Sequence, residues 1–244
     1  MDLPNLKAER LYQKISTLLI GLIKDGTFGQ GVALPAEREL AKQLGVGRSS
    51  VREALIALEI AGWVEIRTGT GVFVRQPDET RAQTTAAEAA ADAEFSAADL
   101  LAARAVIEGE IAALAAKNGT DAQREALARN IGMLEAQSVN NAAFLDEDKR
   151  FHLLISEMTG NAVLTEVMTV LWNKRYSPMF THLETFYADK HIPAAMNADH
   201  RRIGEAILNR DARAAKNAMR AHLRHVHHKL FADTPDEDAC KDAG

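Results

Sequence analysis

The amino-acid sequence predicts a mainly α-helical protein, in which an N-terminal winged helix-turn-helix precedes a C-terminal all-α bundle of six helices. Residues 35–74 contain two short helical patterns followed by a glycine-tipped hairpin pattern. From Ser96 onward, helical periodicity is nearly continuous and no strand pattern interrupts it. The expected parts are a winged domain at 1–76, a linker at 77–95, a helical domain at 96–232 and a disordered tail at 233–244.

Composition and charge narrow the class of protein. The chain has 244 residues, 47% of them hydrophobic, but no run of about 20 uncharged apolar residues, so we expect no membrane span. Charged residues interrupt the first 25 positions and Cys240 is the single cysteine, which together favour a reducing cytoplasm. Residues 1–76 carry ten Lys and Arg against eight Asp and Glu, whereas residues 77–244 carry nineteen against twenty-six. The first segment is therefore the better candidate for binding nucleic acid.

The first three helical patterns have the order of a helix-turn-helix domain. Apolar residues at helical spacing predict a packing helix at 8–24 that ends at Asp25-Gly26. Residues 36–44 place apolar and charged side chains on opposite sides, and Gly45-Val46-Gly47 then supplies a tight turn. We expect the following helix to be the one that enters a DNA groove.

That following helix opens with a polar turn and continues with an apolar face. In a helix-turn-helix, the first turn of the second helix faces the major groove, where arginine can bind guanine and hydroxyl groups can reach phosphates. Unpaired N–H groups at the helix start can also bind a phosphate oxygen. The polar side chains of this turn are Arg48, Ser49, Ser50 and Arg52.

A wing is predicted after this helix. Residues 64–67 and 72–74 alternate as two strands around Thr68-Gly69-Thr70-Gly71, and the glycines permit positive φ and close approach of the backbone to another molecule. An ordinary small α+β core with solvated arginines is the alternative. The three elements in this order favour DNA binding.

The stretch LPAERELAKQLGVGRSSVREALIALEIAGWVEIRTGTGVFV resembles the winged-helix domain of the GntR family of bacterial transcription regulators, and the resemblance extends over about residues 8–76. Gly47 departs from the family pattern, where relatives usually carry Thr or Ser, so no side-chain contact is expected there. The resemblance implies DNA contacts from Arg38, Arg48, Ser49, Ser50, Arg52, Thr68 and Gly69.

Six helices are predicted in the second domain. Ser96 and Thr120 are candidate N-caps, with Asp99 and Gln123 three residues further on. The helices are expected at about 96–117, 120–138, 141–159, 161–186, 194–209 and 211–231.

Scattered polar residues in these helices suggest a metal site. Asp148 and His152 are four residues apart and therefore share a helix face, whereas His200 and His222 lie on later helices. Three imidazoles and a carboxylate suit a divalent metal ion such as Zn, Ni or Mn, and leave room for water or a ligand oxygen. Surface or core histidines are the alternative, and His225 competes with His222 because it lies about one turn further along the same helix.

Residues 100–230 resemble the FCD effector domain of the FadR-type GntR regulators, in LLAARAVIEGEIAALAA, DEDKRFHLLISEMTGNAVL and DHRRIGEAILNRDARAAKNAMRAHL. The resemblance implies that Asp148, His152, His200 and His222 bind the metal. It also places Arg104 toward the cavity, where a guanidinium beside a metal suits a carboxylate ligand. The alternative for Arg104 is a helix-surface pair with Glu108.

The segments FSAADLLAARAVIEGEIAALAA and VLWNKRYSPMFTHLETFY resemble the branch that regulates hexuronate breakdown. This resemblance implies a sugar-acid effector bound by Arg104, Trp172, Arg175 and Tyr176, although Trp172 could equally be a core or dimer contact.

The expected function is a homodimeric repressor of sugar-acid catabolic genes, which binds palindromic operator DNA and is released by a small carboxylate effector. One alternative is a regulator that responds to another organic acid such as lactate, and another is a regulator that senses the metal itself. A metal-dependent enzyme is less favoured, because no separate general base stands out.

Overall fold

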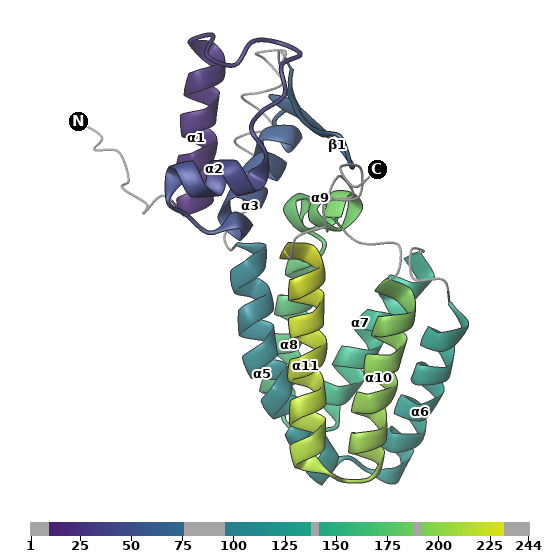
Figure 1. The fold of residues 1–244 in the computed structure, drawn as a ribbon. Coiled ribbons are helices and arrows are strands. Elements are labelled where there is room, and N and C mark those ends of the chain that lie inside the picture. Colours follow the sequence, from purple (N-terminus) through teal and green to yellow (C-terminus); the bar gives the residue numbers. More distant parts are fainter. Residues whose placement is uncertain (1–9, 76–95, 138–141, 188–191, 232–244) are drawn as a thin grey trace, which may run out of the picture. The chain divides into compact units, whose positions relative to one another are not determined.

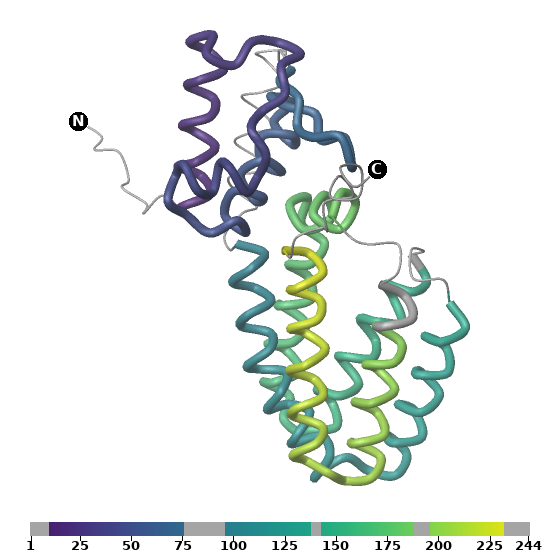
Figure 2. The backbone as a smooth tube through the Cα atoms, in the orientation of Figure 1, coloured from purple at the N-terminus to yellow at the C-terminus, as the bar shows by residue number. Residues whose placement is uncertain are grey.

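The computed structural model describes residues 10–75, 96–137, 142–187 and 192–231 (Figures 1 and 2). The predicted linker, the predicted tail and Cys240 lie outside these described residues. The chain forms two compact units. The first contains the described residues up to Ala97 together with Tyr176–Tyr187, and the second contains the remaining described residues.

The first unit has the predicted order of a winged helix-turn-helix: α1 (Leu11–Lys24), α2 (Glu37–Leu44), α3 (Arg48–Ile60), β1 (Val64–Arg67) and β2 (Gly71–Val74). The strands pair antiparallel, with Val64 opposite Val74 and Arg67 opposite Gly71. Because α1 packs on α3, the apolar stripes of both helices meet in the core, where Leu19, Leu55 and Ile56 are fully buried. The predicted helix-turn-helix and wing are therefore confirmed.

Gly45 makes the turn between α2 and α3. It has φ 65° in the left-handed region and its N–H donates to carbonyl oxygens of the last turn of α2. The next N–H, from Val46, donates to Ala41 O at 3.0 Å, so the end of α2 has the hydrogen bonds of a glycine C-cap. Gly47 is the N-cap of α3. Because glycine has no side-chain hydroxyl, it forms no side-chain capping hydrogen bond.

We expect Gly45→Ala to lower the free energy of unfolding of the first unit by about 1 kcal/mol, because an L side chain is disfavoured at positive φ. Gly21→Ala is the matched control. Gly21 lies inside α1, and a Cβ there would meet nothing within 4 Å, so alanine should stabilise by about 0.4–1 kcal/mol. Native-state hydrogen exchange of α3 amides measures both effects, and equal shifts in the same direction would contradict this account of the turn.

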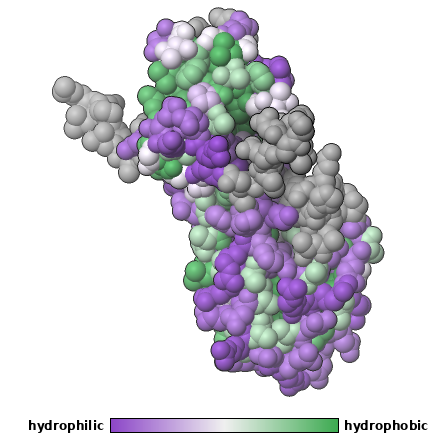
Figure 3. Space-filling view, viewed as in Figure 1, coloured by the Kyte–Doolittle hydropathy of each residue, from purple (hydrophilic) through white to green (hydrophobic). Residues whose placement is uncertain are grey.

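The second unit is a bundle of helices: α5 (Ala97–Asn118), α6 (Asp121–Ala136), α7 (Ala142–Glu157), α8 (Ala162–Lys174), α10 (Ile192–Leu208) and α11 (Ala212–Phe231). Neighbouring helices pack as the pairs α6–α7, α7–α8, α6–α10 and α10–α11. Its visible face is mainly hydrophilic with scattered apolar residues, as expected where the apolar stripes turn inward (Figure 3). Thr120 caps α6 in a reciprocal capping box with Gln123, which confirms that predicted cap.

The helix predicted at 161–186 is divided into α8 and α9 (Pro178–Tyr187), so the described residues from α5 to α11 form seven helices rather than six. Pro178 is the cause. It has no N–H to continue α8 and disfavours helical geometry at Ser177, but it suits the first position of a new helix. The break matters because α9 packs on α3 in the first unit. None of the described helices combines the length and the apolar character needed to cross a membrane.

Candidate metal centre and nucleic-acid interface

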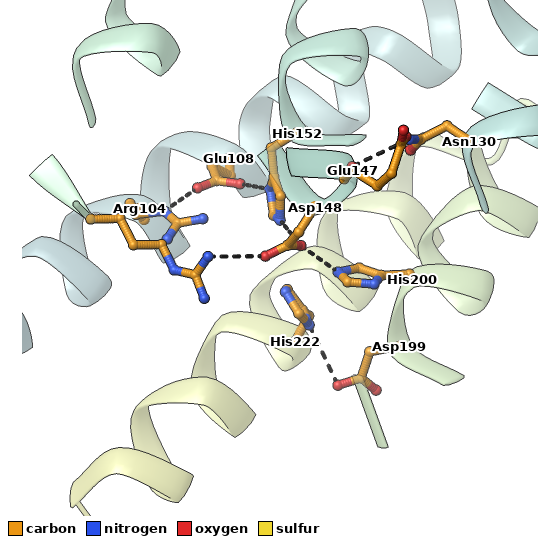
Figure 4. Close-up of polar contacts among 10 residues, drawn as sticks. Arg104, Glu108, Asn130, Glu147, Asp148, His152, Asp199, His200 and His222 are labelled. Atoms are coloured by element: carbon orange, nitrogen blue, oxygen red, sulfur yellow. Dashed lines mark hydrogen bonds and ion pairs between the residues drawn. The ribbon is translucent and has the colours of Figure 1, made fainter. Parts of the chain in front are cut away.

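Three histidines from three helices meet inside the second unit (Figure 4). They are His152 of α7, His200 of α10 and His222 of α11, and each is at most 2% exposed. One ligand atom from each ring lies within 4.8 Å of the others. The ring of Phe151 packs against His200 and the indole of Trp172 packs against His152, so apolar surface encloses the imidazoles.

Asp148 lies one turn before His152 on α7 and turns its carboxylate toward the histidines (Figure 4). Its Oδ1 is 3.1 Å from His200 Nε2 and 3.6 Å from His152 Nε2. Ligand atoms on a tetrahedral zinc ion are separated by roughly 3.3 Å, so these spacings are those of atoms that share one ion. The three-histidine group therefore has the fourth predicted ligand beside it.

The donor atoms of this cluster fit a metal ion because their hydrogen-bonding capacity is unused. Asp148 Oδ1, His152 Nε2 and both ring nitrogens of His200 are buried and have no hydrogen-bond partner in the described part of the chain. Buried polar atoms without partners are costly and uncommon. A divalent ion would satisfy them together, so the geometry provides a group that could hold one.

The electrostatic environment favours the metal-binding protonation state at His222 and Asp148. Burial alone would lower the pKa of His152, but the charge of Glu108 and the contacts with Asp148 and Glu108 raise it. Burial, together with neighbouring His200 and His152, lowers the pKa of His222 to about 4, although Asp199 opposes this shift. Burial alone would raise the pKa of Asp148, but the close polar contacts with His152 and His200 and the charges of His200 and Arg175 hold it well below its usual value. Near neutral pH, His222 is therefore a neutral imidazole and Asp148 an anionic carboxylate, which are the metal-binding forms of these two residues.

Two arginines contact the ring of Trp172 beside the cluster. Arg175 Nη1 lies 3.3 Å from Asp148 Oδ2, and Arg104 Nε donates to Glu108 Oε1 at 2.6 Å. The guanidinium carbons of Arg104 and Arg175 lie 4.7 and 5.0 Å from the centroid of the Trp172 ring. The structure thus brings together three of the four predicted effector residues, whereas Tyr176 belongs to the first unit and is 47% exposed.

The Arg104–Glu108 pair exists, but it is not a surface pair: both residues are buried. Burial alone would raise the pKa of Glu108, yet the charges of Arg104 and His152 lower it to about 2. Glu108 is therefore an anion, and its second oxygen, Oε2, contacts His152 Nδ1. The i,i+4 spacing predicted the pair, but nothing in the spacing predicted the contact with His152.

Asp199 is a residue that the sequence analysis missed. Its Oδ2 lies 2.8 Å from His225 Nδ1 and 3.6 Å from His222 Nδ1. The His225 side chain is 61% exposed and lies outside the three-histidine group, so the geometry groups His222, rather than His225, with His152 and His200. The only sequence signal for Asp199 was its position next to His200.

The predicted DNA-contacting residues occupy the expected elements of the first unit. Arg38 is exposed on α2, and the first turn of α3 carries half-buried Arg48, Ser49 and Ser50. Thr68 and Gly69 are exposed at the tip of the wing, where Gly69 has φ 73°. A positive φ explains why glycine is suited to that tip.

Arg52 has a different environment from the other predicted contacts. It is 5% exposed, its Nη2 lies 2.7 Å from Glu37 Oε2, and its guanidinium stacks 4.2 Å from the ring centroid of Tyr187 on α9. Burial and the Glu37 carboxylate raise the pKa of Tyr187, so its hydroxyl stays neutral. A DNA contact from Arg52 would require its side chain to leave these partners.

Comparison with known proteins identifies both units. Residues 11–74 match the model for bacterial regulatory proteins of the gntR family, and residues 99–225 match the FCD domain model. Among solved structures, one described as Streptococcus agalactiae GntR aligns with 89% of this chain and 99% of its own, at 25% identity and a TM-score of 0.44.

Curated relatives are similar over most of the chain. The Uxu operon transcriptional regulator of Escherichia coli K12 is 36% identical over 228 residues, which cover 92% of this chain and 88% of the relative. The Exu regulon transcriptional regulator of the same organism is 33% identical, covering 93% and 87%. The HTH-type transcriptional repressor NanR of Citrobacter rodentium is 32% identical, covering 91% and 85%.

Proposed function

The chain belongs to the GntR family of bacterial regulatory proteins and carries an FCD domain, and from this premise we propose that it represses genes of sugar-acid breakdown. It is a DNA-binding transcription regulator and not an enzyme. The relatives named for the uxu and exu genes support the hexuronate branch, and the relative named as a repressor supports the sign of regulation.

The observation that carries the effector assignment is that the guanidinium groups of Arg104 and Arg175 both contact the ring of Trp172, next to the histidine cluster. The charges of the two arginines balance those of Glu108 and Asp148. A bound divalent ion would therefore leave the site with excess positive charge, which attracts an anion. An effector carboxylate could bind a guanidinium as a bidentate partner.

The metal would be held by Asp148, His152, His200 and His222. Imidazole nitrogen and carboxylate oxygen suit Zn, Ni or Mn, and four protein ligands leave positions for water or an effector oxygen on an ion of higher coordination number. When bound, the ion would supply a positive charge that attracts the effector. Metal analysis of the purified protein identifies the ion.

The regulatory step requires two copies of the chain. A symmetric homodimer presents two α3 helices, together with the Arg38, Arg48, Ser49, Ser50, Arg52, Thr68 and Gly69 positions, to the half-sites of a palindromic operator in the cytoplasm. The effector can release the operator only if it binds one arrangement of the dimer more tightly than the other. The connection from α8 to α9 is suited to this, because Arg175 contacts Asp148 and α9 packs on α3.

A thermal-shift screen followed by operator-release measurements tests this function. Glucuronate, galacturonate and fructuronate are compared with L-lactate and with neutral glucose, each with and without a divalent metal. We expect a hexuronate to stabilise the metal-loaded protein and release the operator. Release by metal alone would favour a metal sensor, release by lactate would favour another organic acid, and turnover of the sugar acid would favour an enzyme.

Arg104→Lys tests the carboxylate contact. Lysine keeps a positive charge beside Glu108 but loses the planar fork that binds a carboxylate through two N–H groups. We expect the effector affinity to fall by roughly tenfold or more, and effector-free operator binding to stay unchanged. Titration of operator complexes with effector measures both quantities, and a normal effector response would make Arg104 a structural residue.

A further inference from the structure

Glu108 lies between Arg104 and His152 and contacts both side chains (Figure 4). One carboxylate oxygen accepts a hydrogen bond from Arg104 Nε at 2.6 Å, and the other contacts His152 Nδ1. Glu108 is 1% exposed, so water does not compete for either oxygen. Both oxygens of this buried anion are therefore used within the site.

The contact with Nδ1 determines which nitrogen of His152 can bind a metal. A neutral imidazole carries one N–H, and a carboxylate can only accept a hydrogen bond, so the proton belongs on Nδ1. Nε2 then keeps its lone pair. This atom is buried, has no hydrogen-bond partner among the described residues, and lies 3.6 Å from Asp148 Oδ1.

We propose that Glu108 is a positioning residue of the metal centre, which orients His152 with Nε2 toward the ion and is itself oriented by Arg104. The inference rests on the proposed metal site and adds a residue outside its ligand set. A carboxylate behind a metal-bound histidine fixes the tautomer and ring orientation and makes the imidazole a stronger ligand. Arg104 balances the buried charge of Glu108, and thereby links the proposed effector contact to a metal ligand.

The other two histidines lack an equivalent contact. Asp199 Oδ2 stays 3.6 Å from His222 Nδ1 and forms its shorter contact with His225. His200 Nδ1 is buried without a hydrogen-bond partner in the described chain. Among the three rings, His152 is therefore the one whose orientation depends most on an outer carboxylate.

Zinc affinity of Glu108→Gln, measured by competition with a chelating dye, tests the proposal. We expect the affinity to fall by roughly 10- to 100-fold, as for other outer partners of metal ligands. Glu110→Gln is the matched control, because Glu110 lies on the same helix but is exposed and pairs with Lys216. Its zinc affinity should stay within about twofold, since exposed ion pairs contribute little. Equal affinities for both variants would overturn the proposal.

A second measurement does not depend on the stability of the variant. Glutamine at position 108 leaves Arg104 without its buried anion, which can destabilise the unit. Nitrogen-15 NMR of the imidazoles in the wild-type, metal-free protein reports the tautomer directly. We expect a neutral His152 to carry its proton on Nδ1, and a proton on Nε2 would overturn the proposal.

The outcomes separate this inference from the proposed metal site. Wild-type protein that binds no zinc would reject the metal site itself. Wild-type protein whose zinc binding is lost in His200→Ala but unchanged in Glu108→Gln would reject the role of Glu108 alone. In the cobalt-substituted protein, a changed visible absorption spectrum for Glu108→Gln, but not for Glu110→Gln, would support an altered ligand geometry.

Discussion

His200→Ala is expected to reduce the metal content of the purified protein from about one ion per chain to a trace, because it removes one of three converging imidazoles. The remaining donors, Asp148, His152 and His222, would face a cavity where the third ring was buried. Elemental analysis after dialysis against a weak chelator measures the loss. Unchanged stoichiometry would remove His200 from the ligand set.

His225→Ala is the matched control for this experiment. His225 lies one turn beyond His222 on α11, but its side chain is 61% exposed and contacts Asp199 instead of the cluster. The variant should therefore keep its metal. Thermal unfolding adds an independent readout, since metal at 100 times its Kd stabilises the native state by about 2.7 kcal/mol. His225→Ala should show that stabilisation and His200→Ala should not.

Arg48→Ala is expected to weaken specific operator binding by roughly 1–3 kcal/mol if the side chain contacts a base. Arg48 begins α3 directly after the turn at Gly47, so it occupies the part of the helix that enters the major groove. Binding to random DNA should change much less. Titrations of both DNAs at one fixed salt concentration measure the difference, because the phosphate contribution depends strongly on salt.

Arg129→Ala serves as the control for charge. Arg129 is an exposed arginine on α6 of the second unit, and its 3.8 Å pair with Glu125 is on the surface. Its removal changes the net charge equally without affecting α3, so both DNA affinities should stay close to wild type. If Arg48→Ala weakened binding to specific and random DNA equally, Arg48 would be a phosphate contact.

Much of the first unit was predictable because its signals are local. Helical periodicity located α1 to α3, and glycines with positive φ located the turn at Gly45 and the wing tip at Gly69. The same local logic failed between α8 and α9. The apolar and aromatic run through residues 161–186 continued the helical pattern, and Pro178 can begin a helix as well as end one.

Residue spacing alone did not predict which of His222 and His225 faces the cluster, or which residues Arg52 contacts. Both depend on how the helices pack. His222 and His225 are three residues apart, so they lie on neighbouring parts of one helix surface. The packing of α11 against α10 leaves only His222 inside the cluster. Likewise, Arg52 belongs to the polar turn of α3, but its pairing with Glu37 depends on α2. Its stacking on Tyr187 depends on α9, which is distant in sequence.

The sequence by itself determined the fold class, the order of the elements and the residue types that can bind metal, because helix periodicity, caps and turns depend on neighbours a few residues apart. Only the tertiary structure decided which donor atoms converge. A metal site requires atoms from α7, α10 and α11 to meet within ångströms, and the role of Glu108 requires α5 to reach the far side of the His152 ring. Such positions result from side-chain packing between helices, which local patterns do not specify.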